Sequence, residues 1–320
     1  MHWAKFTSVF LICFTLMACA GKKPSGTESS QNEAVTANVP SFCADSAMAF
    51  VTAQCGFGPR IPASSEHGKC VQWLQDKMQS FGADVHLQKG TETDFKGQSL
   101  EITNIMASLS PQFNERVLLL AHYDSRPWAD ADPDPANHSK PVMGANDGAS
   151  GVAVLMELAR VLSRDTLNVG VDILFVDAED MGDNGDEMSW ALGTQYWVKN
   201  LPREDYKPVH AILLDMVGAT GAQFGFEFFS QQYAPGTVSA VWDAASSAGF
   251  SSYFTRRAGG AITDDHVFLC KAGIPCIDII DLRQGGFFPQ WHTAGDVPSV
   301  IDPATLRAVG QTLLAFLYSL

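Results

Sequence analysis

The amino-acid sequence predicts an α/β protein, a three-layer α/β/α sandwich with a central mixed, mostly parallel sheet. Segments with the apolar spacing of helices alternate along the chain with short apolar runs that are typical of strands. Several of these runs are apolar throughout, which is typical of strands that are covered on both faces. The chain has 320 residues, 46% of them apolar, which is enough for one large core.

The expected helices follow from apolar residues that recur every three to four positions. Two such segments, "CADSAMAFVTAQC" and "SEHGKCVQWLQDKMQSF", come first, and a long segment from Pro303 closes the chain. In chain order, the expected helices are 43–55, 65–81, 148–164, 189–200, 233–249, 264–272 and 303–320.

The expected strands lie between these helices. The runs "ADVHLQ" and "LEITNIMASL" alternate in polarity, whereas "RVLLLAHYD" is rich enough in leucine to lie centrally in the sheet. In chain order, the expected strands are 83–88, 100–109, 116–124, 171–180, 211–218 and 274–281. After residue 40 we find no linker and no internal repeat, so residues 41–320 are expected to form a single domain.

The N-terminal segment reads as a targeting sequence. Lys5 precedes an apolar run, Phe6 to Ala18, that is too short to span a bilayer and has the form of a secretory signal. The sequence "LMAC" resembles a bacterial lipobox, in which Cys19 would be lipidated; an ordinary signal peptide cut nearby is the alternative. We therefore expect residues 1–19 to be removed up to Cys19, residues 20–40 to form a flexible tether, and the protein to be an exported lipoprotein of the cell envelope, anchored to a membrane through Cys19.

The net charge and the spacing of the cysteines argue against a nucleic-acid site and against a thiolate zinc site. The net charge of −14 disfavours a nucleic-acid partner, because an acidic surface repels phosphate backbones. No C-x-x-C motif occurs, which disfavours a thiolate zinc site. Disulfide pairing does not follow from the sequence, and buried free thiols are the expected state of the five cysteines of the folded part, Cys43, Cys55, Cys70, Cys270 and Cys276.

Acidic and imidazole side chains follow several expected strands. Open α/β sheets bind ligands at the carboxyl ends of their strands, so these side chains are expected to converge. Each has an ordinary explanation alone: Asp147 before small residues could cap a helix, and His122 could be a hydrogen-bonded core histidine. Together they are costly to bury unless a cation or protons compensate them, and they are the ligand types of zinc. The residues at strand ends are His122, Asp124, Glu179, Asp180 and Asp215, and the further candidates Asp147 and His292 lie in loops.

The order of the motifs H-x-D, N-D-G, D-x-E-D, L-L-D, D-D-H and W-H-T resembles bacterial glutaminyl-peptide cyclotransferases (glutaminyl cyclases) built on the zinc-aminopeptidase fold. The resemblance runs from about residue 45 to the C-terminus and is most specific in "AHYDSRPWADADPDPANHSKPVMGANDGASG" and "ITDDHVFLCKAGIPCIDII". It implies an enzyme that converts the N-terminal glutamine of peptides or proteins to pyroglutamate and releases ammonia.

The resemblance also implies residue roles. One zinc ion is expected, held at the positions of Asp147, Asp180 and His292. Glu179 matches the general acid/base, which would leave Asp180 to the metal. The acids that complete the catalytic network and orient the substrate match Asp215 and Asp264.

Aromatic residues are expected around the substrate. Trp291 matches the aromatic wall of the pocket, with a purely packing role as the alternative. Trp128 and Trp190 could line the mouth of the pocket or only pack.

The sequence departs from related families at several of these positions. Animal cyclases carry Glu where this chain has Asp180, and a network histidine where this chain has Asp278. The position of His122 is a second-metal ligand in the related aminopeptidases but not in cyclases. Asp124 and Asp265, with His122 and Asp278, are further possible members of a second-metal site or of the network.

Two other functions compete with the cyclase. A two-zinc exported aminopeptidase would use His122, Asp147, Asp180, Asp215 and His292 as its five ligands. A metal-free peptide-binding or adhesion domain on the same fold would be expected to lose ligands, and none is missing here. The wider stretches, including "SRPWADADPDPANH" and "TDDH", favour the cyclase.

Overall fold

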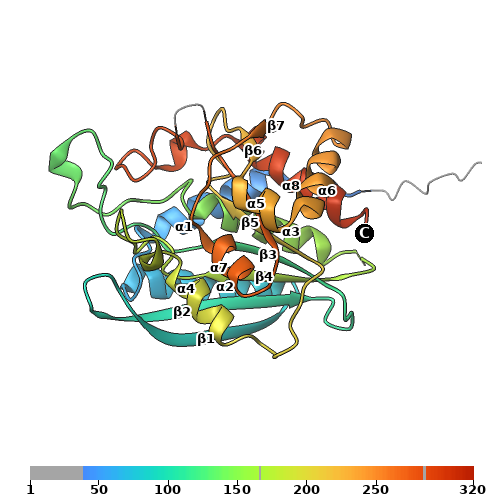
Figure 1. The fold of residues 1–320 in the computed structure, drawn as a ribbon, viewed down its shortest axis with the longest axis horizontal. Coiled ribbons are helices and arrows are strands. Elements are labelled where there is room, and N and C mark those ends of the chain that lie inside the picture. The colour runs from blue at the N-terminus through green and yellow to red at the C-terminus, as the bar shows by residue number, and fades with distance from the viewer. Residues whose placement is uncertain (1–38, 166, 284–285) are drawn as a thin grey trace, which may run out of the picture. The chain divides into compact units, whose positions relative to one another are not determined.

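The computed structural model describes residues 39–165, 167–283 and 286–320 (Figure 1). The expected signal peptide with Cys19, and nearly all of the expected tether, lie outside the described residues. Within the described part of the chain, no helix is both long enough and apolar enough to cross a membrane.

A six-stranded sheet in the spatial order β1-β2-β4-β3-β5-β8 forms the centre of the fold. β3 lies parallel to β4 and β5, and β5 lies parallel to β8, whereas β1 and β2 form an antiparallel edge. The sheet is therefore mixed and mostly parallel, which confirms the predicted fold class. The strands are β1 (Asp84–Thr93), β2 (Ser99–Leu109), β3 (Arg116–His122), β4 (Gly170–Val176), β5 (His210–Asp215) and β8 (Cys276–Ile280).

Helices cover both faces of this sheet. The buried strand β3 shows this directly, because Val117 and Leu119 pack in one hydrophobic core and Leu118 and Leu120 in another. On the second face, α4 and α7 lie side by side (Figure 1). The first face is covered by α1 (Ala44–Phe57), α2 (Ser65–Ser80), α3 (Ala149–Leu162), α6 (Pro235–Ser247) and α8 (Pro303–Leu317), and the second by α4 (Leu192–Lys199) and α7 (Asp265–Lys271).

One short helix was not expected. The helix expected over 233–249 corresponds to α6 (Pro235–Ser247), and α5 (Phe228–Tyr233) precedes it. A proline favours the first turn of a helix because it has no N–H to donate, so a new helix begins at this position. The sequence analysis also missed a two-stranded parallel sheet, β6 (Phe224–Phe226) with β7 (Phe254–Ala258).

Two expected strands end earlier than predicted, and their ends place the polar residues. β4 ends at Val176 and β5 at Asp215, because Ala178 (φ 52°) and Met216 (φ 50°) adopt the left-handed conformation and turn the chain out of the sheet. His122 pairs in register with Val176. The carboxyl ends of the parallel strands therefore open at one edge of the sheet, where the expected site residues follow.

Candidate active site

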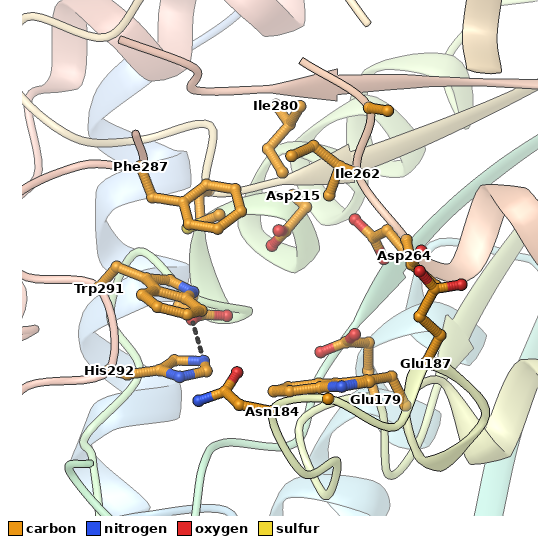
Figure 2. A pocket seen from close by; sticks show the side chains of 16 residues that line it. Glu179, Asn184, Glu187, Asp215, Ile262, Asp264, Ile280, Phe287, Trp291 and His292 are labelled. Carbon is orange, nitrogen blue, oxygen red and sulfur yellow. Dashed lines mark ion pairs between the residues drawn. The ribbon is translucent and has the colours of Figure 1, made fainter. Parts of the chain in front are cut away.

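A cavity of about 220 Å³ lies at the carboxyl edge of the sheet (Figure 2). The loops after β3, β4 and β5, the N-terminus of α7 and the loop around His292 bring their side chains to this edge. Seven of the residues predicted from the sequence line the cavity: Asp147, Glu179, Trp190, Asp215, Asp264, Trp291 and His292. Asp147 and His292, which are 145 positions apart in the chain, thus converge on one cavity, as the order of strand ends predicts.

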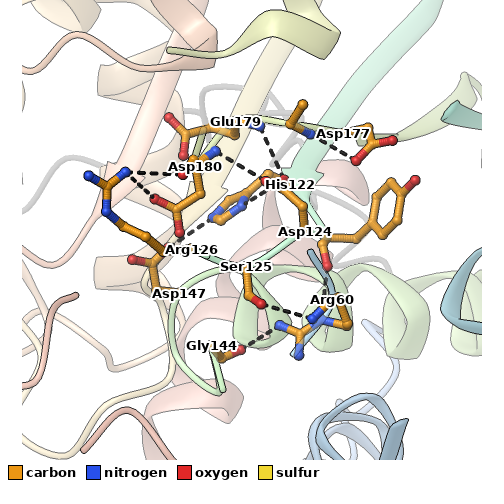
Figure 3. A network of polar contacts seen from close by, with 12 residues as sticks. Arg60, His122, Asp124, Ser125, Arg126, Gly144, Asp147, Asp177, Glu179 and Asp180 are labelled. Carbon is orange, nitrogen blue, oxygen red and sulfur yellow. Dashed lines mark hydrogen bonds and ion pairs between the residues drawn. The ribbon is translucent and has the colours of Figure 1, made fainter. Parts of the chain in front are cut away.

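The turn after β4 presents Glu179 and Asp180 through a clamp made by Asp124 (Figure 3). The two oxygens of the Asp124 carboxylate accept hydrogen bonds from the backbone N–H groups of Glu179 and Asp180, each at 3.1 Å. On the other side, Asp177 accepts a 2.7 Å hydrogen bond from the N–H of Thr103. Asp124 is fully buried, and its role is to hold the turn rather than to enter the cavity.

Asp147, Asp180 and His292 form a compact, buried ligand group. One donor atom of each lies within 4.8 Å of the others, and His292 Nε2 is 3.0 Å from Asp180 Oδ1 and 3.7 Å from Asp147 Oδ2. Asp180 Oδ1 has no hydrogen-bond partner among the described residues. Burial lowers the pKa of His292, but the carboxylates of Asp180, Asp130 and Asp147 outweigh it and raise that pKa to about 9. A site that attracts positive charge so strongly, with oxygen and imidazole donors, fits a zinc ion.

The ring of His292 is oriented from behind by Asp130. His292 Nδ1 lies 3.4 Å from Asp130 Oδ1, so its other nitrogen, Nε2, faces the two carboxylates. Asp130 is in turn bound by both Arg126 Nε, at 2.8 Å, and Arg126 Nη2, at 2.6 Å. Carboxylates in this position fix the tautomer of a metal-binding histidine. The sequence analysis missed Arg126 and Asp130, although both lie in the quoted "SRPWAD" stretch.

Asp147 is fixed by Asp296, a residue that sequence reasoning also missed. The buried carboxylate of Asp296 accepts hydrogen bonds from the N–H groups of Asn146, at 2.8 Å, and Asp147, at 3.1 Å. Asn146 Oδ1 accepts from the N–H of Gly218, which ties this loop to the end of β5. The two loops that carry Asp147 and His292 are thereby joined, since Asp296 follows His292 by four residues.

His122 lies next to the ligand group, on the far side of Asp147. Its Nε2 is 3.1 Å from Asp147 Oδ1 and 3.2 Å from Asp215 Oδ1, and its Nδ1 is 3.4 Å from Asp124 Oδ1. These three groups, His122, Asp147 and Asp215, also lie within 4.8 Å of one another. Asp147 therefore turns one oxygen to each of two ligand groups, which is the arrangement that a second metal ion would need.

The remaining acids of the cavity hold protons readily. Burial raises the pKa of Glu179 well above its ordinary value, and the negative charges of Asp264 and Asp180 add to this effect. Burial likewise raises the pKa of Asp215 to about 6, and burial together with Asp215 raises that of Asp264 to about 7. Carboxyl groups in this range can accept and donate protons near neutral pH.

Behind Asp264 lies a buried group that includes His266, which the sequence analysis did not single out. His266 Nε2 is 3.1 Å from Glu227 Oε2, and its Nδ1 is 3.8 Å from Asp278 Oδ2. Asp264, His266 and Asp278 have donor atoms within 4.8 Å of one another. Asp265 is buried here too, and neither Asp265 nor Asp278 lines the cavity. The "TDDH" motif was the available signal for His266; nothing in the sequence pointed to Glu227.

Aromatic rings form the walls of the cavity (Figure 2). The ring of Trp291 stacks on His292 with 3.7 Å between centroids and 20° between planes, and Trp190 lies on that histidine at 5.9 Å and 16°. Phe287 packs against Trp291 at 4.8 Å. Trp128 does not line the cavity; it packs outside, 4.5 Å from Lys96 Nζ and against Phe95 and Arg126, in keeping with the packing role that the sequence analysis gave as the alternative.

Comparison with known proteins agrees with this geometry. Residues 104–317 match the model of peptidase family M28. A solved glutaminyl cyclase of Bacteroides thetaiotaomicron, bound to N-acetylhistamine, is 44% identical with a TM-score of 0.87; the alignment covers 88% of this chain and all of that one. The glutaminyl cyclase of Porphyromonas gingivalis is 48% identical with a TM-score of 0.85, over 87% of this chain and 98% of that one.

A protein described as a zinc-dependent exopeptidase, from Parabacteroides distasonis, is similar to the same degree. It is 44% identical with a TM-score of 0.85, and the alignment covers 88% of this chain and all of that one. The chain therefore belongs to peptidase family M28 and, within that family, to the group that includes the bacterial glutaminyl cyclases.

Proposed function

We propose that this protein is a zinc-dependent glutaminyl-peptide cyclotransferase, which converts the N-terminal glutamine of peptides and proteins to pyroglutamate and releases ammonia. The observation that supports it most is the juxtaposition, in one small aromatic-walled cavity, of a ligand group for one cation with proton-holding carboxyl groups. Cyclisation needs both, because an amide carbon must be made electrophilic and a proton must move from one nitrogen to another. The likeness to solved glutaminyl cyclases at 44–48% identity supports the same activity.

Asp147, Asp180 and His292 would hold a single zinc ion. Their donor atoms are close enough, they are of the right chemical types, and Asp180 Oδ1 accepts no hydrogen bond from the described residues. When bound, zinc supplies Lewis-acid polarisation of the glutamine side-chain carbonyl, which is worth several kcal/mol.

Glu179 would carry the proton. The α-amine nitrogen of the substrate attacks the side-chain amide carbon, a C–N bond forms, and the bond from that carbon to the amide nitrogen breaks. Glu179 accepts the proton that the attacking amine loses and donates it to the departing nitrogen, which leaves as ammonia. The raised pKa of Glu179 suits this exchange, since a carboxyl group must be able to hold the proton between the two steps.

Asp215 and Asp264 would position the substrate amine. Both are almost fully buried yet line the cavity, so they present acceptors to the amine without many competing waters. Trp291 would pack on the apolar part of the glutamine side chain. Trp190, which also stacks on His292, would form a further part of the cavity wall. This closed geometry would hold the amine near the amide carbon, which favours ring closure.

A two-zinc aminopeptidase is the second function that we consider. The observation that favours it is the position of Asp147 between two ligand groups, with His122 and Asp215 on the second side. In that enzyme Glu179 would activate a water molecule, and a substrate with any suitable N-terminal residue would be hydrolysed.

One experiment separates the two activities. The purified protein, supplied with zinc, is incubated with one peptide that begins with Gln and one that begins with Leu, and both are followed by mass spectrometry. Loss of ammonia from the first peptide with the second untouched supports the cyclotransferase. Release of free leucine supports the aminopeptidase and makes His122 and Asp215 metal ligands.

We also propose that the protein is exported and anchored to a membrane of the cell envelope through a lipidated Cys19. The lipobox-like "LMAC" and the polar stretch that follows support this proposal. A Cys19→Ser variant should move from the membrane fraction to the soluble fraction or retain its signal peptide uncut. An unchanged distribution of the variant between the fractions, together with normal removal of its signal peptide, would contradict the anchor.

A further inference from the structure

A second cavity adjoins the first and shares lining residues with it. Its volume is about 550 Å³, and Ile262 and Phe287 line both cavities. The first cavity, at about 220 Å³, is smaller than the roughly 300 Å³ at which drug-sized ligand sites begin, so it suits one side chain and its amine. A peptide whose N-terminal residue fills the first cavity therefore has room to extend past Ile262 and Phe287 into the second.

The second cavity is basic. On strand β7, Thr255 and Arg257 line it, because residues two apart lie on the same face of a strand. Arg256, between them, points to the opposite face and pairs with Asp243 at 2.5 Å. Among the described residues, no carboxylate pairs with the exposed side chain of Arg257, so its charge faces the cavity and solvent.

Arg283 adds a second guanidinium to the lining. Its Nε and Nη2 are bound to Asp281, at 2.9 and 2.7 Å, and Nη2 also donates to the carbonyl of Thr220. This anchoring fixes the position of the guanidinium while leaving Nη1 without a carboxylate partner among the described residues. The negative charge of Asp281 balances the positive charge of Arg283. The lining of the second cavity therefore keeps one unbalanced positive charge, that of Arg257, although the net charge of the protein is −14.

The two adjoining cavities thus have opposite electrostatic character. The first is lined by carboxyl groups, among them Glu179, Glu187 and Asp264, and suits a positively charged α-amine. The second presents arginines, whose planar guanidinium groups bind carboxylates through paired hydrogen bonds. A ligand that complements both has an amine at its N-terminus and a carboxylate a short distance along the chain.

We propose that the cavity lined by Arg257 and Arg283 is a substrate subsite that binds a carboxylate downstream of the N-terminal glutamine, so that the enzyme favours acidic peptides. This inference rests on the proposed function and names the substrate class for the same site. The carboxylate could belong to an Asp or Glu side chain or to the C-terminus of a short peptide, and the experiment below tells these sources apart.

The test compares tetrapeptides that begin with Gln and end in an amide, with Glu at the second, third or fourth position. Each has a partner with Gln at that position, which has the same shape without the charge. One further peptide has only neutral side chains and ends in a free carboxylate instead of an amide. We expect kcat/KM to be about three- to tenfold higher for the charged member of at least one pair, the size of one partly exposed ion pair, and to fall toward the neutral value at high salt.

Two variants assign that preference to the cavity. Arg257→Gln should bring the ratio of charged to neutral kcat/KM close to one, and Arg257→Glu should invert it. Arg256→Gln is the matched control, because Arg256 is the next residue on the same strand but points away, and it should keep the ratio. A ratio near one for every pair, or a preference that survives Arg257→Gln, would overturn the proposed subsite.

Affinity measurements keep this test independent of turnover. Calorimetry with the same peptide pairs and the zinc-loaded Glu179→Gln variant, which should keep zinc but not cyclise the peptides, gives the ratio of Kd values without turnover. If no peptide is cyclised, the proposed function fails, while a higher affinity for the charged peptide that Arg257→Gln removes still supports the subsite. Equal affinities within every pair would rule the subsite out, whatever the activity.

Discussion

Glu179 and Asp180 are adjacent carboxyl groups whose surroundings shift their pKa values in opposite directions. Burial alone would raise the pKa of Asp180, but His292 and Arg126 lower it below its ordinary value. Burial raises the pKa of Glu179 well above its ordinary value, and negative neighbours raise it further. Asp180 therefore tends to keep its charge while Glu179 takes up a proton more readily, so the two residues suit different tasks: binding a cation and moving a proton.

Substitutions should separate these two tasks. Glu179→Gln should retain zinc but lose cyclisation by about a hundredfold or more, because it removes a general acid/base without touching the ligand group. Asp180→Ala should lose zinc, because it removes one of three ligands. Metal content by elemental analysis and cyclisation rates check both outcomes, and near-normal turnover by Glu179→Gln would show that another group carries the proton.

Asp124 should control metal affinity although it does not enter the cavity. Asp124→Asn replaces one acceptor oxygen of the clamp with an amide NH2 group, which donates and cannot accept from the backbone N–H, so the turn carrying Asp180 should loosen. We expect zinc to bind about ten- to a hundredfold more weakly, as for other residues that orient metal ligands. The measurement is a zinc titration against a competing chelator.

The matched control for that variant is Asp94→Asn. The Asp94 carboxylate also accepts from two backbone N–H groups, those of Lys96 and Gln98, but it lies in a turn that does not line the cavity or touch the ligand group. Equal zinc affinities for the Asp124→Asn variant and the unmodified protein would mean that the turn holds its shape without the clamp.

At the level of elements, the sequence predicts which residues meet because strand ends are easy to identify. Apolar runs of strand length mark β3, β4 and β5, and parallel strands bring the residues after them to one edge. This is why His122, Glu179, Asp180 and Asp215 could be grouped before any coordinates were known. The helix α5 was missed because its six residues are too few to show a helical apolar period.

The supporting residues could not be predicted, for a different physical reason. Asp296 lies 150 residues from Asn146, whose N–H it binds, and Glu227 lies 39 residues from His266. Neither contact leaves a periodic pattern in the sequence, since each depends on where a loop passes rather than on the face of a helix or strand. Such residues become visible only when loops are placed in space.

The close approach of α3 to β5 is a further element-scale feature with a measurable consequence. A Cβ at Gly151 would clash with the backbone carbonyl of Leu214, so Gly151→Ala must push the helix away from the strand. We expect a loss of about 1–3 kcal/mol of stability, seen as a lower Tm. Gly236→Ala is the control: it is also in the first turn of a helix, nothing lies within 4 Å of its Cβ position, and it should leave Tm unchanged or slightly higher.

Over the whole molecule, the sheet and its two helical layers enclose several buried carboxyl groups whose pKa is raised. Burial raises the pKa of Asp264 to about 7, and burial together with Asp264 raises that of Asp265 to about 8. In the unfolded chain both would titrate near 4. The folded protein therefore binds more protons than the unfolded chain between about pH 4 and 8, and its stability must fall as the pH rises through that range.

The corresponding measurement is the Tm of the metal-stripped protein across that pH range. We expect Tm to fall between about pH 5 and 8, and added zinc to raise Tm most at the upper end, where the carboxylates are charged and no protons compete with the cation. A Tm that rises with pH in the metal-free protein would show that these carboxyl groups are ionised in the fold.

The stacking of two indole rings on His292 makes the metal site its own optical reporter. Trp291 and Trp190 lie nearly parallel to that imidazole on the walls of the cavity, so a change in its charge alters the electronic surroundings of both. Zinc binding, loss of a proton from His292 and entry of a substrate should each change the emission of these tryptophans. Occupancy can therefore be followed in real time, in the unlabelled protein, by its intrinsic fluorescence.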